Sequence, residues 1–143
     1  MVVAVWGERS ACGWSPLFPI VDLEVASEVC PLFFHLGQGA TLARLCAEVG
    51  LETIEEQRIA ATLAYADGDE ACGAAFVGGP VALAWSRFDD DVRARVRGRY
   101  LDAIGMWRHH QGYLVPGEFV VVTAAAPREA SAVARPALHS MTR

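Results

Sequence analysis

The feature that most constrains this fold is a run of β-branched and other apolar residues, Met1–Trp6, which is ended by Gly7. Apolar side chains at consecutive positions cover both faces of a strand, so this run predicts a strand buried from both sides in a parallel or mixed sheet. A second run of this kind, Glu118–Ala124, follows a turn predicted at Pro116-Gly117. We therefore expect a sheet with two strongly apolar inner strands.

An inner strand needs a neighbour at each edge, and nothing in this sequence precedes Met1–Trp6 to form one of them. An unpaired edge exposes a row of amide N–H and carbonyl groups beside an apolar surface. We expect another polypeptide or a second copy of the chain to fill this edge, unless the chain is a truncated product.

The stretch Glu8–Leu36, called the insertion below, combines three prolines with many large apolar side chains. Loops are rarely so apolar, and the stretch predicts a lid that covers something apolar. Its segment Val21–Val29 favours a short helix between two prolines. Thr41–Val49 is predicted to be a helix, because its apolar residues recur at helical spacing and Gly50 follows as a C-terminal stop.

Glu52–Tyr65 favours a strand, because threonine, isoleucine and tyrosine recur along it. Its polar centre, Glu55–Arg58, is typical of a position near a sheet edge. A helix is predicted over Asp67–Phe76, where an aspartate and a glutamate have the spacing of a capping box and Gly78-Gly79 follow. A short helical segment, Val81–Trp85, comes next.

The longest predicted helix begins at Ser86 and Asp89, which repeat the capping spacing. Asp89 and Asp91 are expected to pair with the arginines four residues further on. The helix carries one apolar stripe made of Phe88, Val92, Val96, Tyr100, Ile104 and Trp107.

Composition excludes several functions. The chain has 143 residues, a net charge of −5, and 12 basic residues, all of which are arginine. The lysine Schiff base of pyridoxal phosphate, a phosphate-loop lysine, and a lysine that carries biotin or lipoate are therefore impossible. The acidic balance argues against nucleic acid as a partner.

The longest uncharged stretch, Ala71–Ser86, is broken by glycine and proline and is too short to span a membrane. The start of the chain lacks the basic flank of a secretory signal, so we expect no membrane partner and a cytoplasmic protein. The four cysteines have no C-x-x-C spacing and are interpreted as small buried thiols: Cys12, Cys30, Cys46 and Cys72.

Four clusters have a functional and a structural interpretation, and the structural one is favoured for each. Asp89–Asp91 complements a helix dipole without a cation, and His109-His110 forms a solvated helix end. Gly78–Pro80 terminates a helix and lacks the residues of a phosphate cradle. The arginines from Arg87 to Arg99 are spread around a helix and form an ion-paired surface. No metal site is expected.

His35 lies beside Phe33 and Phe34, where an imidazole among aromatic side chains could orient a substrate or act as a base. A satisfied core histidine is the favoured alternative, because no partner acid is identifiable. Trp14 and Phe18 carry the same ambiguity between a pocket wall and the core of the lid.

Four segments belong together: EVCPLFF (28–34), AFVGGPVALA (75–84), SRF (86–88) and GYLVPGEF (112–119). As a set they resemble the C-terminal half of class I S-adenosylmethionine-dependent methyltransferases, nearest to the small-molecule enzymes grouped with ubiquinone and menaquinone biosynthesis. The resemblance covers residues 1–126, and residues 127–143 are expected to be a flexible tail.

The resemblance implies a partial Rossmann-like α/β fold with several helices and a three-stranded mixed sheet in the order five, seven, six. Val2–Trp6 is then strand five and Glu52–Ile59 strand six. Glu118–Ala124 is strand seven, antiparallel and between the other two. The front half of such an enzyme holds the glycine-rich loop and the acid that bind S-adenosylmethionine, and this chain has no G-x-G-x-G. We expect no tight binding of that cofactor by this chain alone.

The sequence thus predicts a methyltransferase-family protein that acts on a small molecule, as an incomplete fragment without the cofactor-binding half. Methyl transfer in the complete relative needs positioning and exclusion of water and no covalent nucleophile, so no catalytic residue is assigned. The candidate substrate-binding residues are Trp14, Phe33, Phe34 and His35. The alternative is a non-enzymatic half-domain that dimerises or docks through the strand at 2–6, or binds an apolar ligand.

Overall fold

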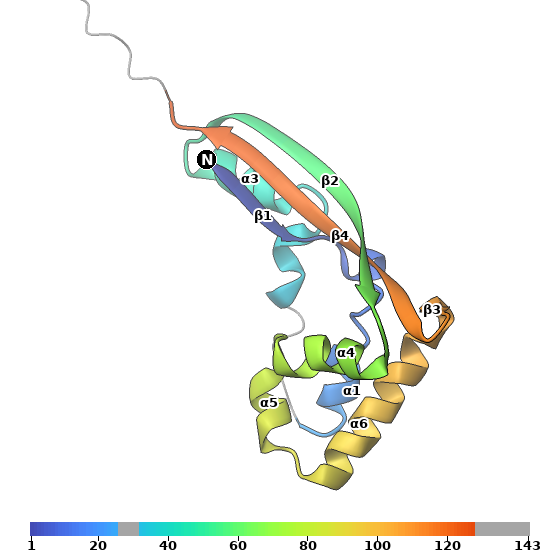
Figure 1. The fold of residues 1–143 in the computed structure, drawn as a ribbon. Helices are drawn as coiled ribbons and strands as arrows, with labels where there is room; N and C mark the ends of the chain where they lie inside the picture. The colour runs from blue at the N-terminus through green and yellow to red at the C-terminus, as the bar shows by residue number, and fades with distance from the viewer. Residues whose placement is uncertain (26–31, 128–143) are drawn as a thin grey trace, which may run out of the picture.

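The computed structural model describes residues 1–25 and 32–127, and its centre is an open antiparallel sheet (Figure 1). Three long strands lie in the order β1-β4-β2, and the two-residue β3 also pairs with β4. The sheet therefore has four strands with antiparallel pairing throughout, and the predicted three-stranded mixed sheet is wrong in both respects. The strands are β1 (Val2–Trp6), β2 (Glu52–Tyr65), β3 (Arg108–His109) and β4 (Gly112–Ala125).

β4 lies between β1 and β2, which is the position predicted for Glu118–Ala124, and β2 lies at an edge as predicted. The predicted turn at Pro116-Gly117 is wrong, because both residues lie inside β4. Pro116 faces Thr62 of β2, and its carbonyl accepts a hydrogen bond of 2.9 Å from the Gly13 N–H. The nitrogen of Pro116 faces the same side as its carbonyl, away from β2 and beyond the end of β1. The missing N–H of the proline therefore removes no hydrogen bond from the ladder between β4 and β2.

β1 is not buried from both sides, which corrects the prediction. Val3 and Val5 pack against a small core beneath helix α3 (Thr41–Glu48), whereas Val2 is 67% exposed and Ala4 is also exposed. Within the described residues β1 pairs with β4 alone, so its other edge is open. The strand is therefore apolar on both faces, but the described residues cover only the face that carries Val3 and Val5.

α3 ends as its sequence predicts. Gly50 has a φ of 81°, and the N–H groups of Gly50 and Leu51 bond to the carbonyls of Ala47 at 2.9 Å and Cys46 at 3.1 Å. This is a Schellman motif, in which a left-handed residue satisfies the last carbonyls of the helix. The motif directs the chain from α3 straight into β2.

The other helices gather at the end of the sheet where β2 stops and β4 begins (Figure 1). In the part of the chain that the structure describes, no helix has the length and apolar character needed to cross a bilayer. The helices at this end are α1 (Leu17–Asp22), α4 (Gly68–Cys72), α5 (Ala82–Arg87) and α6 (Asp90–Ala103), with the π-helical turn η3 (Gly73–Val77) and the 3-10 turn η4 (Gly105–Trp107). Two further 3-10 turns lie beside the sheet, η1 (Arg9–Ala11) next to β4 and η2 (His35–Gly37) next to β1 and α3.

The capping box before α4 is confirmed, since the Asp67 carboxylate accepts a 2.9 Å bond from the N–H of Glu70. The start of the longest helix is corrected, because Asp89 and not Ser86 caps α6, accepting a 2.9 Å bond from the Val92 N–H. Ser86 belongs to α5, and the extended backbone of Phe88 separates the two helices. The predicted stripe still points inward over most of its length: Val96, Tyr100 and Ile104 are fully buried.

The predicted helix at Val21–Val29 is wrong over residues 21–25, because α1 covers Leu17–Asp22 and ends there. Residues 26–29 of that prediction lie outside the described residues, and so does the predicted tail from residue 128. Pro19 sits in the first turn of α1, where its missing N–H would have no partner in the helix anyway. α1 is part of the main core and packs with α6. The core residues from the insertion are Cys12, Trp14, Leu17, Phe18, Ile20, Val21 and Phe34.

Glu24 ties the insertion to α6. Its carboxylate accepts two hydrogen bonds from Arg95, at 2.9 and 2.7 Å, and one from Arg99 at 2.9 Å. Arg95 therefore pairs with Glu24 across the fold and not with Asp91, the predicted partner. Arg93 was predicted to pair with Asp89, but its ion pair is with Asp90, at 3.8 Å. The hydrogen bonds from Arg95 are the main reason that the pKa of Glu24 is lowered.

We expect Glu24→Gln to remove part of the acid sensitivity of folding. A carboxyl whose pKa is lowered by folding adds stability above its ordinary pKa, about 4.3, and that stability is lost as the pH falls through the folded-state value. Urea midpoints should therefore fall less between neutral pH and about pH 3.5 in Glu24→Gln than in the parent chain.

The control for this measurement is Glu48→Gln, which changes an exposed pair with Arg44 and should behave like the parent chain. An equal loss of stability on acidification in all three proteins would contradict the assigned role of Glu24.

Candidate functional site

A pocket of about 540 Å³ is lined by residues from the ends of β1 and β2. Trp6 is the last residue of β1, Leu63 and Tyr65 close β2, and all three line the pocket. Because β1 and β2 are both antiparallel to β4, they run parallel to each other. β1 ends at Trp6, level with Ile59 of β2, and β2 continues to Tyr65, so the pocket lies beyond the end of β1 and beside the last residues of β2. A concave, largely apolar pocket with a few polar groups is the usual form of a site for a small molecule.

The insertion forms one wall of the pocket through Trp14, Leu17 and Phe33. The Trp14 ring lies 4.8 Å from that of Trp6 and meets Phe33 edge-on at 5.7 Å. Aromatic rings in this arrangement offer flat, rigid apolar surfaces to a bound molecule. Two of the four sequence-predicted candidates, Trp14 and Phe33, therefore come together in the pocket wall.

The other two candidates do not line this pocket. Phe34 is buried behind Trp14 in the aromatic cluster, with its ring 5.4 Å away. His35 is exposed, so the favoured interpretation as a core histidine is wrong. It begins η2, whose Gly37 lies so close to the end of β1 that a Cβ there would be 2.0 Å from the Trp6 carbonyl oxygen. The turn packs through its backbone and leaves the imidazole outside.

The opposite wall was missed as a site by sequence reasoning. It is formed by the π-helical turn and the Gly78–Pro80 segment that ends it. The Gly78 N–H bonds to the Gly73 carbonyl at 3.2 Å, and a Cβ at Gly79 would lie 2.3 Å from the Ala75 carbonyl oxygen. The glycines do terminate a helix as predicted, but this close packing also sets the shape of the pocket; π-helical turns are frequent at functional sites.

Tyr100 of α6 completes the pocket and is fully buried against Phe76, with the two rings edge-on at 5.2 Å. Among the described residues its hydroxyl has no hydrogen-bond partner, and neither has the indole N–H of Trp14. The third such atom is a carboxylate oxygen of Glu56, away from the pocket. Buried polar atoms are nearly always paired, so two unpaired polar atoms on residues that line one pocket need an explanation.

Burial raises the pKa of Tyr100 far above its ordinary value, and burial also raises the pKa of Tyr65. Both phenols are therefore neutral at physiological pH, and the hydroxyl of Tyr100 can donate as well as accept a hydrogen bond. Burial likewise raises the pKa of the Cys72 thiol to about 11. It also raises the pKa of the Cys12 thiol. These thiols stay protonated and are not nucleophiles.

Cys12, Cys46 and Cys72 are buried free thiols, which confirms their interpretation, while Cys30 lies outside the described residues. Asp89 caps α6, which is the structural role favoured for the acidic cluster. The prediction that His109-His110 ends a helix is wrong: His109 lies in β3 and His110, with a φ of 54°, begins the turn to β4.

The arginines of α6 form ion pairs with other elements, as predicted for that surface. Arg95 and Arg99 bind Glu24, and Arg97 binds Asp69 of α4. Over residues 1–25 and 32–127, no three histidine, cysteine or acidic side chains gather in a metal-binding group.

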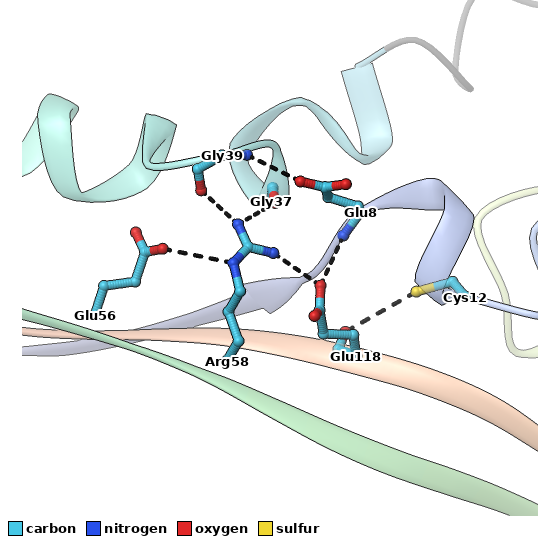
Figure 2. Close-up of polar contacts among 7 residues, drawn as sticks. All are labelled: Glu8, Cys12, Gly37, Gly39, Glu56, Arg58 and Glu118. Atoms are coloured by element: carbon cyan, nitrogen blue, oxygen red, sulfur yellow. Dashed lines mark hydrogen bonds and ion pairs between the residues drawn. The ribbon is translucent and has the colours of Figure 1, made fainter.

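A polar network around Arg58 of β2 fixes both ends of the insertion (Figure 2). Arg58 donates to the carboxylate of Glu118 at 2.8 Å, to the Gly37 carbonyl at 3.0 Å and to the Gly39 carbonyl. Glu118 also accepts from the Glu8 N–H at 3.1 Å, and Glu8 accepts from the Gly39 N–H at 3.4 Å. The start and the end of the insertion are thus held on the same carboxylate–guanidinium pair.

We expect Arg58→Ala to lower the free energy of unfolding by about 2 kcal/mol, because it leaves a partly buried carboxylate and two carbonyls without their donor. Arg58→Lys should recover little of this loss, since an ammonium lacks the planar fork that reaches all three acceptors. Urea denaturation measures both.

The control is Arg44→Ala, which removes a well-exposed pair with Glu48 and should cost less than about 0.5 kcal/mol. Equal losses for Arg44→Ala and Arg58→Ala would mean that the network does not hold the insertion.

We expect Tyr100→Phe to raise the free energy of unfolding by about 1 kcal/mol, because it removes a buried hydroxyl that has no partner while keeping the ring. Urea denaturation of the ligand-free chain tests this. A loss of about 1 kcal/mol instead would show that the hydroxyl has a partner in the folded protein.

No protein-family model matches this chain, and a search of the curated proteins finds no match. The assignment of a function therefore rests on the residues and the geometry of the pocket.

Proposed function

We propose that this chain forms the acceptor-binding side of a class I S-adenosylmethionine-dependent methyltransferase and holds a small, largely apolar molecule. The observation that carries the proposal is the aromatic-walled pocket beyond the end of β1, lined by Trp6 of that strand and by Leu63 and Tyr65 near the end of β2. The antiparallel strand between these two parallel strands is the arrangement that the sequence resemblance implies. The pocket thus occupies the end of the sheet at which such a fold binds its ligands.

The pocket suits an acceptor and not a nucleoside. Among residues 1–25 and 32–127, its lining contains no acidic side chain that could bind the two hydroxyls of a ribose. The cofactor of this family supplies an electrophilic methyl group, and the acceptor supplies the nucleophilic atom. What this chain contributes is positioning of the acceptor and exclusion of water, through Trp6, Trp14 and Phe33.

We propose that the cofactor-binding part docks on the open edge of β1. A second polypeptide or a further segment of the same polypeptide would supply it. β1 carries no charged residue or proline that would protect such an edge from pairing. The same observation favours a second candidate function, a non-enzymatic half-domain that dimerises through this edge. The two candidates differ in whether the pocket binds a ligand.

We expect the chain to bind N-phenyl-1-naphthylamine, a neutral fluorescent apolar probe, and Ala74→Trp to weaken this binding at least about tenfold, the effect of losing about 1.4 kcal/mol. Ala74 lines the pocket but is exposed, so an indole there fills the pocket without disturbing the core. Probe fluorescence measures both affinities.

The control is Ala47→Trp on the exposed side of α3, which should bind the probe like the parent chain. Equal weakening by both variants, or no saturable binding by the parent, would count against the pocket. In the same solutions, S-adenosylmethionine should give no saturable heat on titration; micromolar binding would contradict the division into an acceptor side and a cofactor side.

A further inference from the structure

We infer that the pocket accepts a neutral, ring-shaped molecule with a hydrogen-bonding oxygen, which the Trp14 indole N–H and the Tyr100 hydroxyl hold. This inference deepens the proposed function and rests on it, because it names the chemical class of the molecule in the same pocket. It starts from the two orphaned polar atoms, which come from distant parts of the chain, the insertion and α6, and meet in one pocket lining.

An orphaned polar atom in a folded protein carries a cost that a ligand can remove. Trp14 is 6% exposed and Tyr100 is fully buried, so bulk water does not compensate either group. Apart from the pocket pair, only one other buried side-chain atom lacks a partner among residues 1–25 and 32–127. The orphans are therefore concentrated at the pocket, where binding of an oxygen atom would be strengthened by low-dielectric surroundings.

The two groups together fit an oxygen atom. An indole N–H only donates, whereas a phenol hydroxyl both donates and accepts. A ligand hydroxyl can accept from Trp14 while it donates to Tyr100, and a ligand carbonyl can accept from both. Trp14 and Tyr100 both line the pocket. Phe33 and Tyr65, which also line it, are only partly buried. For the ligand to reach both atoms, side chains of the lining must change rotamer on binding, and such changes are common in binding sites.

The charge of the lining selects against ions. The described residues that line it are aromatic, aliphatic, glycine or proline, with no acid, arginine or histidine among them. A carboxylate or ammonium ligand would lose its hydration there and gain no counter-charge. Tyr100 stays protonated because burial raises its pKa, so it does not repel a neutral oxygen with a phenolate charge.

The test compares three probes of one shape by isothermal titration calorimetry at neutral pH: naphthalene, 2-naphthol and 2-naphthoate. The expected order is 2-naphthol tightest, at least about tenfold tighter than naphthalene, with 2-naphthoate weakest. Tyr100→Phe keeps the ring and should leave the affinity for naphthalene unchanged, whereas Trp14→Phe also makes the pocket wall smaller. Each variant is therefore judged by the ratio of its affinities for 2-naphthol and naphthalene, which should fall by about three- to tenfold.

The matched control is Tyr113→Phe, which removes a buried phenol hydroxyl outside the pocket lining and should leave all three affinities unchanged. Equal binding of all three probes, or an advantage of 2-naphthol that survives both pocket substitutions, would overturn this inference and leave the proposed function standing. No binding of any probe by the folded parent chain would overturn the proposed function itself. Circular dichroism of each variant confirms folding.

Discussion

The fold depends on the pairing of β4 with both of its neighbours. One strand of 14 residues pairs with β1 over Phe119–Thr123 and with β2 along nearly its whole length. This pairing makes β1 and β2 parallel and brings the end of β1 and the last residues of β2 to one pocket, although about fifty residues separate the two strands in the chain. Pro116 is tolerated in the middle of β4 because its nitrogen faces the side on which β1 has already ended.

The insertion is a structural part of the domain and also a wall of its pocket. Its apolar residues form much of the main core with α6, while Glu24 and the Arg58–Glu118 pair hold it from two sides. The same segment therefore supplies burial, which stabilises the domain, and an aromatic surface, which lines the pocket. Tyr100 combines both roles as well, since its ring packs in the core while its hydroxyl stays without a partner.

Part of the candidate site could be predicted from the sequence. Trp14 and Phe33 were found because large aromatic side chains in a loop-like segment require a hydrophobic neighbour. Tyr100 was recognised only as part of a helical stripe, because periodicity reports burial and says nothing of whether a hydroxyl finds a partner. His35 was misplaced, since sequence neighbours do not show on which side of a 3-10 turn an imidazole lies.

The sequence by itself determined the local elements that depend on nearby residues: the Schellman end of α3, the capping box before α4, the strand character of β1 and β2, and the absence of lysine chemistry. Only the tertiary structure decided how far β4 extends, that Asp89 starts α6, that Glu24 binds Arg95, and which aromatic residues share a pocket. These features depend on contacts between residues distant in the chain, whose free energies outweigh local propensity and leave no trace in any short stretch of sequence.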